Sequence, residues 1–156
     1  MSSVPASLVK LRTMVAADLA AVVAIENSSY SMPWGESTFR ALLRRGDSDL
    51  VVAEMGNAVV GYAVWWHTLD QGELGNLAVE AEYRRHGIGS RLVAEAVRRA
   101  SSRHVREMFL EVRQSNHGAR DLYAQLGFLP VGVRRGYYIR PAEDAIVMRL
   151  AIPPSS

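Results

Sequence analysis

The stretch that decides the fold is Arg84-Arg-His-Gly-Ile-Gly89, which follows an apolar segment ending at Val79. The residues after it, 89–100, carry apolar side chains at helical spacing and predict a helix. The first N–H groups of a helix lack partners and carry the positive end of its dipole, so this turn suits a diphosphate. Gly87 and Gly89 permit the close backbone approach that such binding needs. Two glycines before a helix are also a common turn, and neither nucleotide fingerprint, G-x-G-x-x-G or G-x-x-x-x-G-K-S/T, is present.

The segments on either side of this turn predict one mixed sheet. Apolar runs predict strands at residues 8–13, 50–55, 58–66, 73–79, 108–112, 128–138 and 145–151, and helical spacing predicts helices at 18–27, 36–45, 89–100 and 116–126. We expect turns at Gly56-Asn57 and Asp70-Gln-Gly72, and we expect Gly127 to end the last helix. Strand–helix–strand segments in the second half require parallel neighbours, whereas the first half is antiparallel. The expected fold class is α/β (α+β), with a single, mostly antiparallel sheet of about seven strands flanked by about four helices.

Length and composition indicate one domain without disulfides. The 156 residues contain no cysteine, which excludes disulfide scaffolds, thiolate metal sites and cysteine nucleophiles. A chain of this size buries roughly 70% of its unfolded surface, so its core needs no crosslink. We expect one domain at residues 8–152, with flexible ends at 1–7 and 153–156. Because apolar runs fall short of the ~20 residues of a membrane span and no signal peptide is evident, we expect a cytoplasmic protein without a membrane partner.

Charge is divided unevenly along the chain. Residues 1–82 carry 5 basic and 10 acidic side chains, whereas residues 83–156 carry 13 and 6. The second half is therefore the one expected to attract an anion. Of the 18 basic residues 17 are arginine, whose planar guanidinium suits phosphate, although a genomic bias explains the same composition. The four histidines are scattered without ligand-spaced acidic partners, so we expect no metal site.

Motifs beyond the glycine turn indicate a family. The pattern R-x-x-G-x-G follows the strand Leu77-Ala-Val79 and precedes Leu110-Glu-Val-Arg113, Asn116 and Leu122-Tyr-Ala-Gln-Leu-Gly-Phe128. From about residue 11 to 150 the chain resembles the GCN5-related N-acetyltransferase (GNAT) superfamily. It resembles more narrowly the RimI group, the ribosomal-protein-alanine N-acetyltransferases, in Ile25-Glu-Asn-Ser-Ser-Tyr-Ser-Met-Pro-Trp34, Gly72-Glu-Leu-Gly-Asn-Leu-Ala-Val79, Arg134-Arg-Gly-Tyr-Tyr138 and Glu143-Asp-Ala-Ile-Val-Met148. Two features depart from the pattern. Gly75 stands where the family usually has a bulkier residue, and the loop 139–142 is short.

The resemblance implies acetyl transfer from the cosubstrate acetyl-CoA to an amine, on a GNAT fold whose sheet is splayed between the fourth and fifth strands. The pantetheine arm would pair with the first of these strands at Leu77, Ala78 and Val79, because its amides can satisfy backbone groups that the splay leaves unpaired. One of those N–H groups would also stabilise the oxyanion formed during transfer. The resemblance assigns further cofactor contacts to Arg84, Arg85, His86, Gly87, Ile88, Gly89, Ser90 and Asn116. Asn116 is also suited to cap a helix, and the two roles are compatible.

Glu111 and Tyr123 match the family's catalytic positions. Strand alternation places Leu110 and Val112 on one face and Glu111 on the other, so Glu111 need not be buried in the core. From the sequence alone, the usual role of a lone glutamate such as Glu111 is that of a solvated strand residue or a partner of Arg113, and Tyr123 is a core tyrosine. The resemblance implies that Glu111 accepts the proton of the amine, directly or through water, and that Tyr123 protonates the departing thiolate.

Four aromatic residues, Tyr30, Trp34, Tyr137 and Tyr138, are expected to wall the acceptor groove, although each also suits core or rim packing. Three acidic residues are candidates for attracting a basic peptide: Glu26, which helical spacing places outward, Glu36 and Asp144. An α-amine with a pKa of about 7.8 needs about 1 kcal/mol to be neutral at pH 7, whereas lysine at about 10.4 needs nearly 5 kcal/mol. One modest base therefore favours an N-terminal amine without excluding lysine.

The leading hypothesis is transfer to the N-terminal alanine of a small-subunit ribosomal protein, which would be the peptide partner. The alternatives are a related enzyme with broader peptide, lysine or small-amine acceptors, and a non-catalytic acyl-CoA sensor. Nucleic-acid binding through the arginine-rich segment 84–120 is a weaker alternative, because Phe109 is the one aromatic residue interleaved with those arginines.

Overall fold

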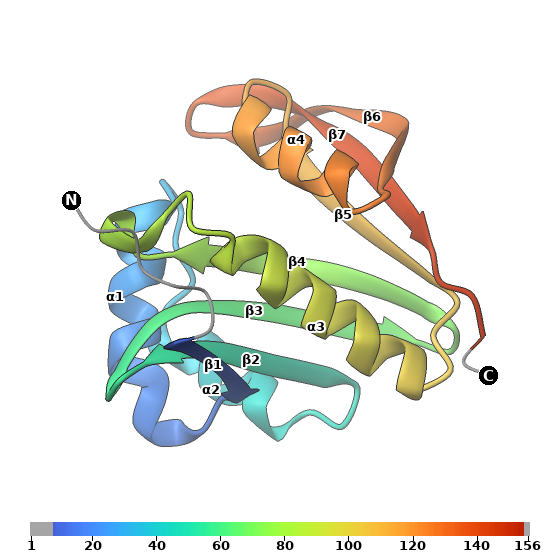
Figure 1. Ribbon diagram of the computed structural model, residues 1–156. Coiled ribbons are helices and arrows are strands. Elements are labelled where there is room, and N and C mark those ends of the chain that lie inside the picture. Colours follow the sequence, from blue (N-terminus) through green and yellow to red (C-terminus); the bar gives the residue numbers. More distant parts are fainter. Residues whose placement is uncertain (1–7, 155–156) are drawn as a thin grey trace.

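The computed structural model describes residues 8–154 (Figure 1). The expected flexible ends at 1–7 and 155–156 lie outside the described residues, whereas Pro153 and Pro154 are exposed and follow the last strand. No helix among residues 8–154 is both long enough and apolar enough to cross a membrane. Within the same residues, no three His, Asp or Glu side chains gather in a way that would hold a metal ion.

The predicted order of strands and helices is confirmed. The strands are β1 (Val9–Thr13), β2 (Ser48–Met55), β3 (Ala58–Thr68), β4 (Gln71–Val79), β5 (Glu107–Arg113), β6 (Leu129–Ile139) and β7 (Ala142–Ala151). The α-helices are α1 (Leu19–Ser29), α2 (Glu36–Arg44), α3 (Ile88–Ser102) and α4 (His117–Gln125). The turn expected at Asp70-Gln-Gly72 was wrong in its position. It lies at Leu69–Asp70, because Thr68 at the end of β3 already pairs with Gln71 at the start of β4.

The sheet is mixed and has the order β1-β2-β3-β4-β5-β7-β6, which confirms the expected fold class. Every neighbouring pair is antiparallel except β4 and β5. These two pair only over Gln71–Glu73 with Glu107–Phe109, and then diverge (Figure 1). The expected splay between the fourth and fifth strands is therefore present, and it leaves one edge of β4 free from Leu74 onward.

The splay divides the sheet into a larger half-sheet, β1–β4, and a smaller one, β5–β7. Helices cover both faces of the larger half-sheet. Leu50 and Val52 of β2 pack with α1 and α2, whereas Val51 and Ala53 pack with Ile88 at the start of α3. Because successive strand residues point to opposite faces, α3 lies across the sheet from α1 and α2. In the smaller half-sheet, α4 packs on β5 and β7 in a cluster that includes Tyr123, Phe128 and Met148.

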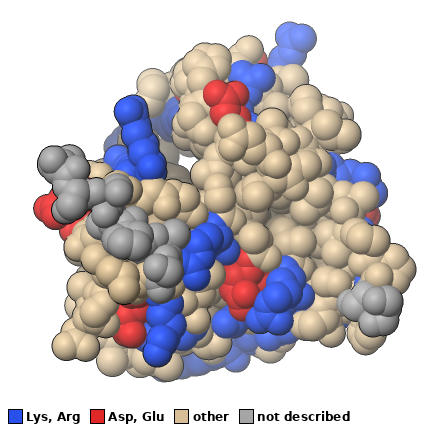
Figure 2. Space-filling view, viewed as in Figure 1, with Lys and Arg blue, Asp and Glu red and all other residues tan. Residues whose placement is uncertain are grey.

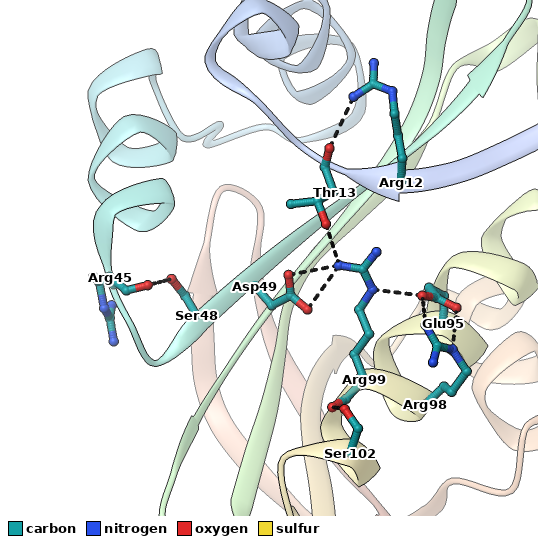
Figure 3. Close-up of polar contacts among 9 residues, drawn as sticks. All are labelled: Arg12, Thr13, Arg45, Ser48, Asp49, Glu95, Arg98, Arg99 and Ser102. Carbon is teal, nitrogen blue, oxygen red and sulfur yellow. Dashed lines mark hydrogen bonds and ion pairs between the residues drawn. The ribbon is translucent and has the colours of Figure 1, made fainter.

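Polar contacts fix the C-terminal half of α3 to the first two strands (Figure 3). Arg99 donates to Thr13 Oγ1 at 2.9 Å and to Asp49 at 3.2 Å. Arg99 also donates to Glu95 at 2.8 Å, and Glu95 pairs with Arg98 at 2.6 Å. These contacts hold α3 in place, and with it the glycine-rich turn at its other end.

Candidate active site

The glycine-rich turn has the geometry expected for binding an anion. Gly87 is the N-cap of α3 with φ +80°, a left-handed conformation that favours glycine. The first intrahelical bond runs from Arg91 N–H to the Gly87 carbonyl at 3.1 Å. The N–H groups of Ile88, Gly89 and Ser90 therefore have no partner within the helix and lie at the positive end of its dipole.

The free edge of β4 is capped by side chains. The Tyr30 hydroxyl donates to the Leu77 carbonyl at 2.8 Å and accepts from the Leu77 N–H at 3.2 Å. Arg84 Nε donates to the Val79 carbonyl at 2.9 Å. Leu77 and Val79 thus direct backbone groups into the opening. Ala78 lies between them, and strand alternation turns its backbone groups toward β3, where it pairs with Tyr62.

A cleft of about 770 Å³ joins the turn to this edge. Figure 2 shows the molecule hollowed between the part that carries α4 and the part that carries α1 and α3. Every predicted cofactor-binding residue except His86 lines the cleft: Leu77, Ala78, Val79, Arg84, Arg85, Gly87, Ile88, Gly89, Ser90 and Asn116. The Asn116 side chain accepts from Ala119 N–H at 3.1 Å, which confirms that it caps α4.

A second cavity of about 520 Å³ adjoins the cleft on the other side of Tyr30. It contains all the predicted catalytic and acceptor-binding residues: Glu111, Tyr123, Tyr30, Trp34, Tyr137 and Tyr138. Ser29, Tyr30, Leu77, Asn116 and Ala119 line both spaces, so the two meet at the splay. A thioester lying along β4 would therefore reach the second cavity.

Glu111 lies in the second cavity with a side chain that is 16% exposed. Its expected partner, Arg113, instead pairs with Glu143, and Arg134 donates to Glu111 Oε1 at 3.0 Å. Burial and the charge of Glu73 raise the pKa of Glu111 above its ordinary value, while Arg134 opposes them. The raised pKa makes Glu111 a better proton acceptor near neutral pH.

Tyr123 is buried where α4 faces the splay, and its ring contacts Phe128 edge-on at 5.8 Å between centroids. Among residues 8–154, its hydroxyl makes no hydrogen bond to the protein and it lines the second cavity. Burial raises the pKa of Tyr123, so its phenol remains protonated and can act as a donor.

The second cavity is closed by the β6–β7 hairpin and by the loop before α2. The β6 strand has an irregularity between Arg134 and Tyr138, which re-aims the stacked rings of Tyr137 and Tyr138. Across the cavity, Ser31 Oγ donates to the Arg140 carbonyl at 2.5 Å and joins the loop before α2 to the β6–β7 hairpin. Trp34 packs edge-on against Phe39, and so lies partly in the core.

The prediction that Glu26 points outward was wrong. Glu26 is 0% exposed, because Trp34 N–H and Asn76 Nδ2 both donate to Glu26 Oε2 at 2.8 Å and the Tyr62 hydroxyl also bonds it. It therefore positions the loop that carries Trp34 instead of attracting a peptide. Of the other two candidates, Glu36 is exposed beside Arg40, and Asp144 accepts from Gly136 N–H.

Sequence reasoning missed Glu73 and Trp66, which also line the second cavity. Trp66 Nε1 donates to Glu73 Oε2 at 3.1 Å. The departure at Gly75 was a signal for this arrangement. A Cβ at Gly75 would lie 2.5 Å from the Trp66 ring, so only glycine leaves room for the indole at this point.

A mixed sheet that splays beside a glycine-rich helix start is the architecture that the sequence motifs predicted. Residues 19–128 match the model of the Acetyltransferase (GNAT) family. The chain therefore belongs to the GNAT family, which confirms the resemblance seen in its motifs.

Two curated relatives are bacterial enzymes named ribosomal protein bS18-alanine N-acetyltransferase. The enzyme of Escherichia coli K12 is 35% identical over 137 residues, covering 86% of this chain and 92% of its own length. The enzyme of Haemophilus influenzae is 32% identical over 136 residues, covering 85% and 92%.

Solved structures agree with the fold. The ribosomal-protein-S18-alanine N-acetyltransferase from Escherichia coli has a TM-score of 0.86 at 31% identity, covering 95% of this chain and 96% of its own. Arabidopsis thaliana NAA60 in complex with acetyl-CoA has a TM-score of 0.84 at 20% identity, covering 92% and 98%, and shows the shared fold.

Proposed function

We propose that the chain transfers the acetyl group of acetyl-CoA to the N-terminal alanine of ribosomal protein bS18, as the names of its curated relatives state for them. The observation that carries the proposal is the junction of two spaces at Tyr30 and Leu77, one beside an anion-binding helix start and one beside Glu111. The working unit is a single domain at residues 8–152, and its place of action is the cytoplasm.

The cleft residues hold the cosubstrate at both ends. The N–H groups of Ile88, Gly89 and Ser90 bind the diphosphate, with Arg84 and Arg85 adding positive field. Leu77 and Val79 offer backbone groups to the amides of the pantetheine arm, which must replace the capping contacts of Tyr30 and Arg84. An N–H on the free edge of β4 is placed to stabilise the oxyanion.

Glu111 and Tyr123 move the two protons of the reaction. Glu111 takes a proton from the acceptor's ammonium, whose freed electron pair attacks the thioester carbon. As the carbon–sulfur bond breaks, Tyr123 gives its proton to the thiolate, and the surplus proton of the new amide passes to solvent or to the tyrosinate. A single carboxylate of raised pKa matches an α-amine better than a lysine, because neutralising the lysine costs several kcal/mol more.

A panel of peptides that differ only in their first residue tests the proposal. With acetyl-CoA and the purified chain, we expect the bS18 N-terminal peptide to give the highest kcat/KM, and mass spectrometry to locate the acetyl group on the alanine amine. Equal rates for all first residues, or equal rates with free lysine and polyamines, would contradict the preference for alanine and would indicate an enzyme with broad acceptor specificity. Tight acetyl-CoA binding without turnover would instead indicate a sensor.

A further inference from the structure

Glu73 and Glu111 stand on opposite sides of the point where the sheet opens. Glu73 pairs with Phe109 in the last β4–β5 pair before the strands diverge, and Glu111 lies two residues beyond Phe109 on β5. Paired residues share a sheet face, and so do residues two apart on one strand. Both carboxyl groups therefore project from the same face, and both line the second cavity.

The Glu73 carboxyl is held in position by its neighbours. Trp66 Nε1 donates to Glu73 Oε2 at 3.1 Å, and the Trp66 ring lies over Gly75 on the same strand. Trp34 packs against Trp66 with ring centroids 6.2 Å apart. One oxygen of Glu73 is thus bonded to the indole, which leaves the other for the cavity.

In the described part of the chain, few positive charges face the two carboxyl groups. From β6, Arg134 bonds Glu111 but is 59% exposed, and the neutral phenols of Tyr137 and Tyr138 complete that side. From β5, Arg113 is engaged by Glu143 and lies over the Tyr138 ring at 4.2 Å. The phenols of Tyr30 on α1 and Tyr123 on α4 close the remaining sides. Two acids facing one exposed guanidinium make a cavity that suits a cation.

We propose that Glu73 forms a carboxylate pair with Glu111, and that this pair binds the positively charged α-amino group of the acceptor. The inference rests on the proposed function and adds an acceptor-binding residue to it. When the amine loses its proton, the N–H electron pair stays on nitrogen and the proton forms an O–H bond on Glu111. Glu73 accepts a hydrogen bond from the protonated Glu111, so the proton is retained beside the cavity.

The unpartnered hydroxyl of Tyr123 supports this placement of the amine. It is buried and lines the same cavity without a hydrogen-bond partner among residues 8–154. An amine held between Glu73 and Glu111 therefore lies in the space that a donor for the leaving thiolate also faces. The charge of Glu73 also contributes to the raised pKa of Glu111, second to burial.

The test compares Glu73→Gln with Glu107→Gln, a matched control on β5 whose carboxylate pairs with Arg149 away from the cavity. Carbon-13 NMR titration of the Glu111 carboxyl, assigned by its loss in Glu111→Gln, reports its pKa in the protein alone. We expect Glu73→Gln to lower that pKa by about one unit, and Glu107→Gln to leave it unchanged. An unchanged pKa in Glu73→Gln would overturn the pair.

Kinetics then measure the binding of the amine. For an alanine-led peptide at pH 7, we expect Glu73→Gln to raise KM about tenfold and to leave the Kd of acetyl-CoA unchanged. Trp66→Phe, which keeps an aromatic side chain but removes the indole donor, should change KM in the same direction by less. If KM does not change in Glu73→Gln, Glu73 does not bind the amine. If the wild-type chain fails to acetylate any peptide, the proposed function is wrong, while the NMR titration still decides whether the pair exists.

Discussion

The Tyr30 hydroxyl occupies the place beside Leu77 that an added strand would take. It satisfies both the N–H and the C=O of Leu77, whose pairing the splay has removed. Because an unpaired backbone group costs about 1 kcal/mol or more when buried, this contact stabilises the empty cleft. It also competes with a pantetheine arm for the same two groups.

Replacing Tyr30 by Phe tests this competition. We expect Tyr30→Phe to bind acetyl-CoA about fivefold more tightly, because the empty state loses a hydrogen bond that the bound state does not need. Isothermal titration calorimetry measures the Kd directly. Weaker binding in the variant would show that Tyr30 contacts the cosubstrate instead of competing with it.

Glu111→Gln removes the proposed proton acceptor while keeping the shape of the side chain. We expect kcat to fall about 100-fold, within the usual contribution of a general base. In the wild-type chain the rate should rise with pH as Glu111 ionises, over a range displaced upward because the pKa of Glu111 is raised. In Glu111→Gln this rise should be absent. If the rate of Glu111→Gln still rises with pH over the same range, the rise comes from the ionisation of another group.

Tyr123→Phe separates proton donation from packing, because the variant keeps the ring that contacts Phe128. We expect kcat to fall about 100-fold, with the Kd of acetyl-CoA within twofold of the wild-type value, since the lost proton is needed only when the thiolate leaves. Stopped-flow detection of the free thiol checks the rate. A Kd that rises as much as kcat falls would point to a binding role.

Residue patterns predicted the orientation of Glu111, but neither the burial of Glu26 nor the contact of Glu73 with Trp66. Alternation on β5 was enough to turn Glu111 away from the core. Glu26 is buried because three partners from β3, β4 and the loop before α2 converge on it, and helical spacing contains no such information. A single glutamate at position 73 looks like a solvated strand residue until the indole of Trp66 is known to bond it.

At the scale of elements, α3 is held to the sheet by a polar network centred on Glu95. Its carboxylate bonds Arg98 and Arg99, and these contacts lower the pKa of Glu95 to about 2. The pKa in the unfolded chain is about 4.3. The contribution to stability is therefore complete above that value and declines as pH falls towards 2.

Glu95→Gln should lower the free energy of unfolding by about 1 kcal/mol at pH 7, since each pair is part-exposed. The difference from wild type should shrink as pH falls from about 5 to about 3. Urea unfolding at several pH values measures it. Glu36→Gln, which breaks an exposed pair at 3.5 Å on α2, is the control and should change stability by only a few tenths of a kcal/mol. A difference that is constant with pH would contradict the role of charge.

Element boundaries were predictable where local chemistry sets them. Gly127 has φ +100° and ends α4 as expected, and Asn116 caps its start. The end of α1 was missed by two residues, because Ser28 and Ser29 continue the helix by bonding the Ile25 carbonyl. The position of β7 between β5 and β6 depends on pairing across the sheet, which no local pattern determines.

On the scale of the whole molecule, the sheet is two half-sheets joined by a short seam. Only Gln71–Glu73 of β4 pair with β5, and beyond them the halves diverge around the cleft (Figure 1). The cleft takes lining from β4 and α3 on one side and from α4 on the other. A ligand that fills it contacts both halves, so binding should stabilise the fold as a unit.

Acetyl-CoA at 100 times its Kd should add about 2.7 kcal/mol to stability. For a domain of this size that corresponds to a rise in Tm of about 5–10 °C. The diphosphate is expected to bind at Ile88, Gly89 and Ser90, so a pantetheine derivative without it should give a much smaller shift at the same concentration. Differential scanning calorimetry compares the two ligands. Equal shifts would mean that the glycine-rich turn does not bind the diphosphate, because the pantetheine contacts on β4 would then account for all of the stabilisation.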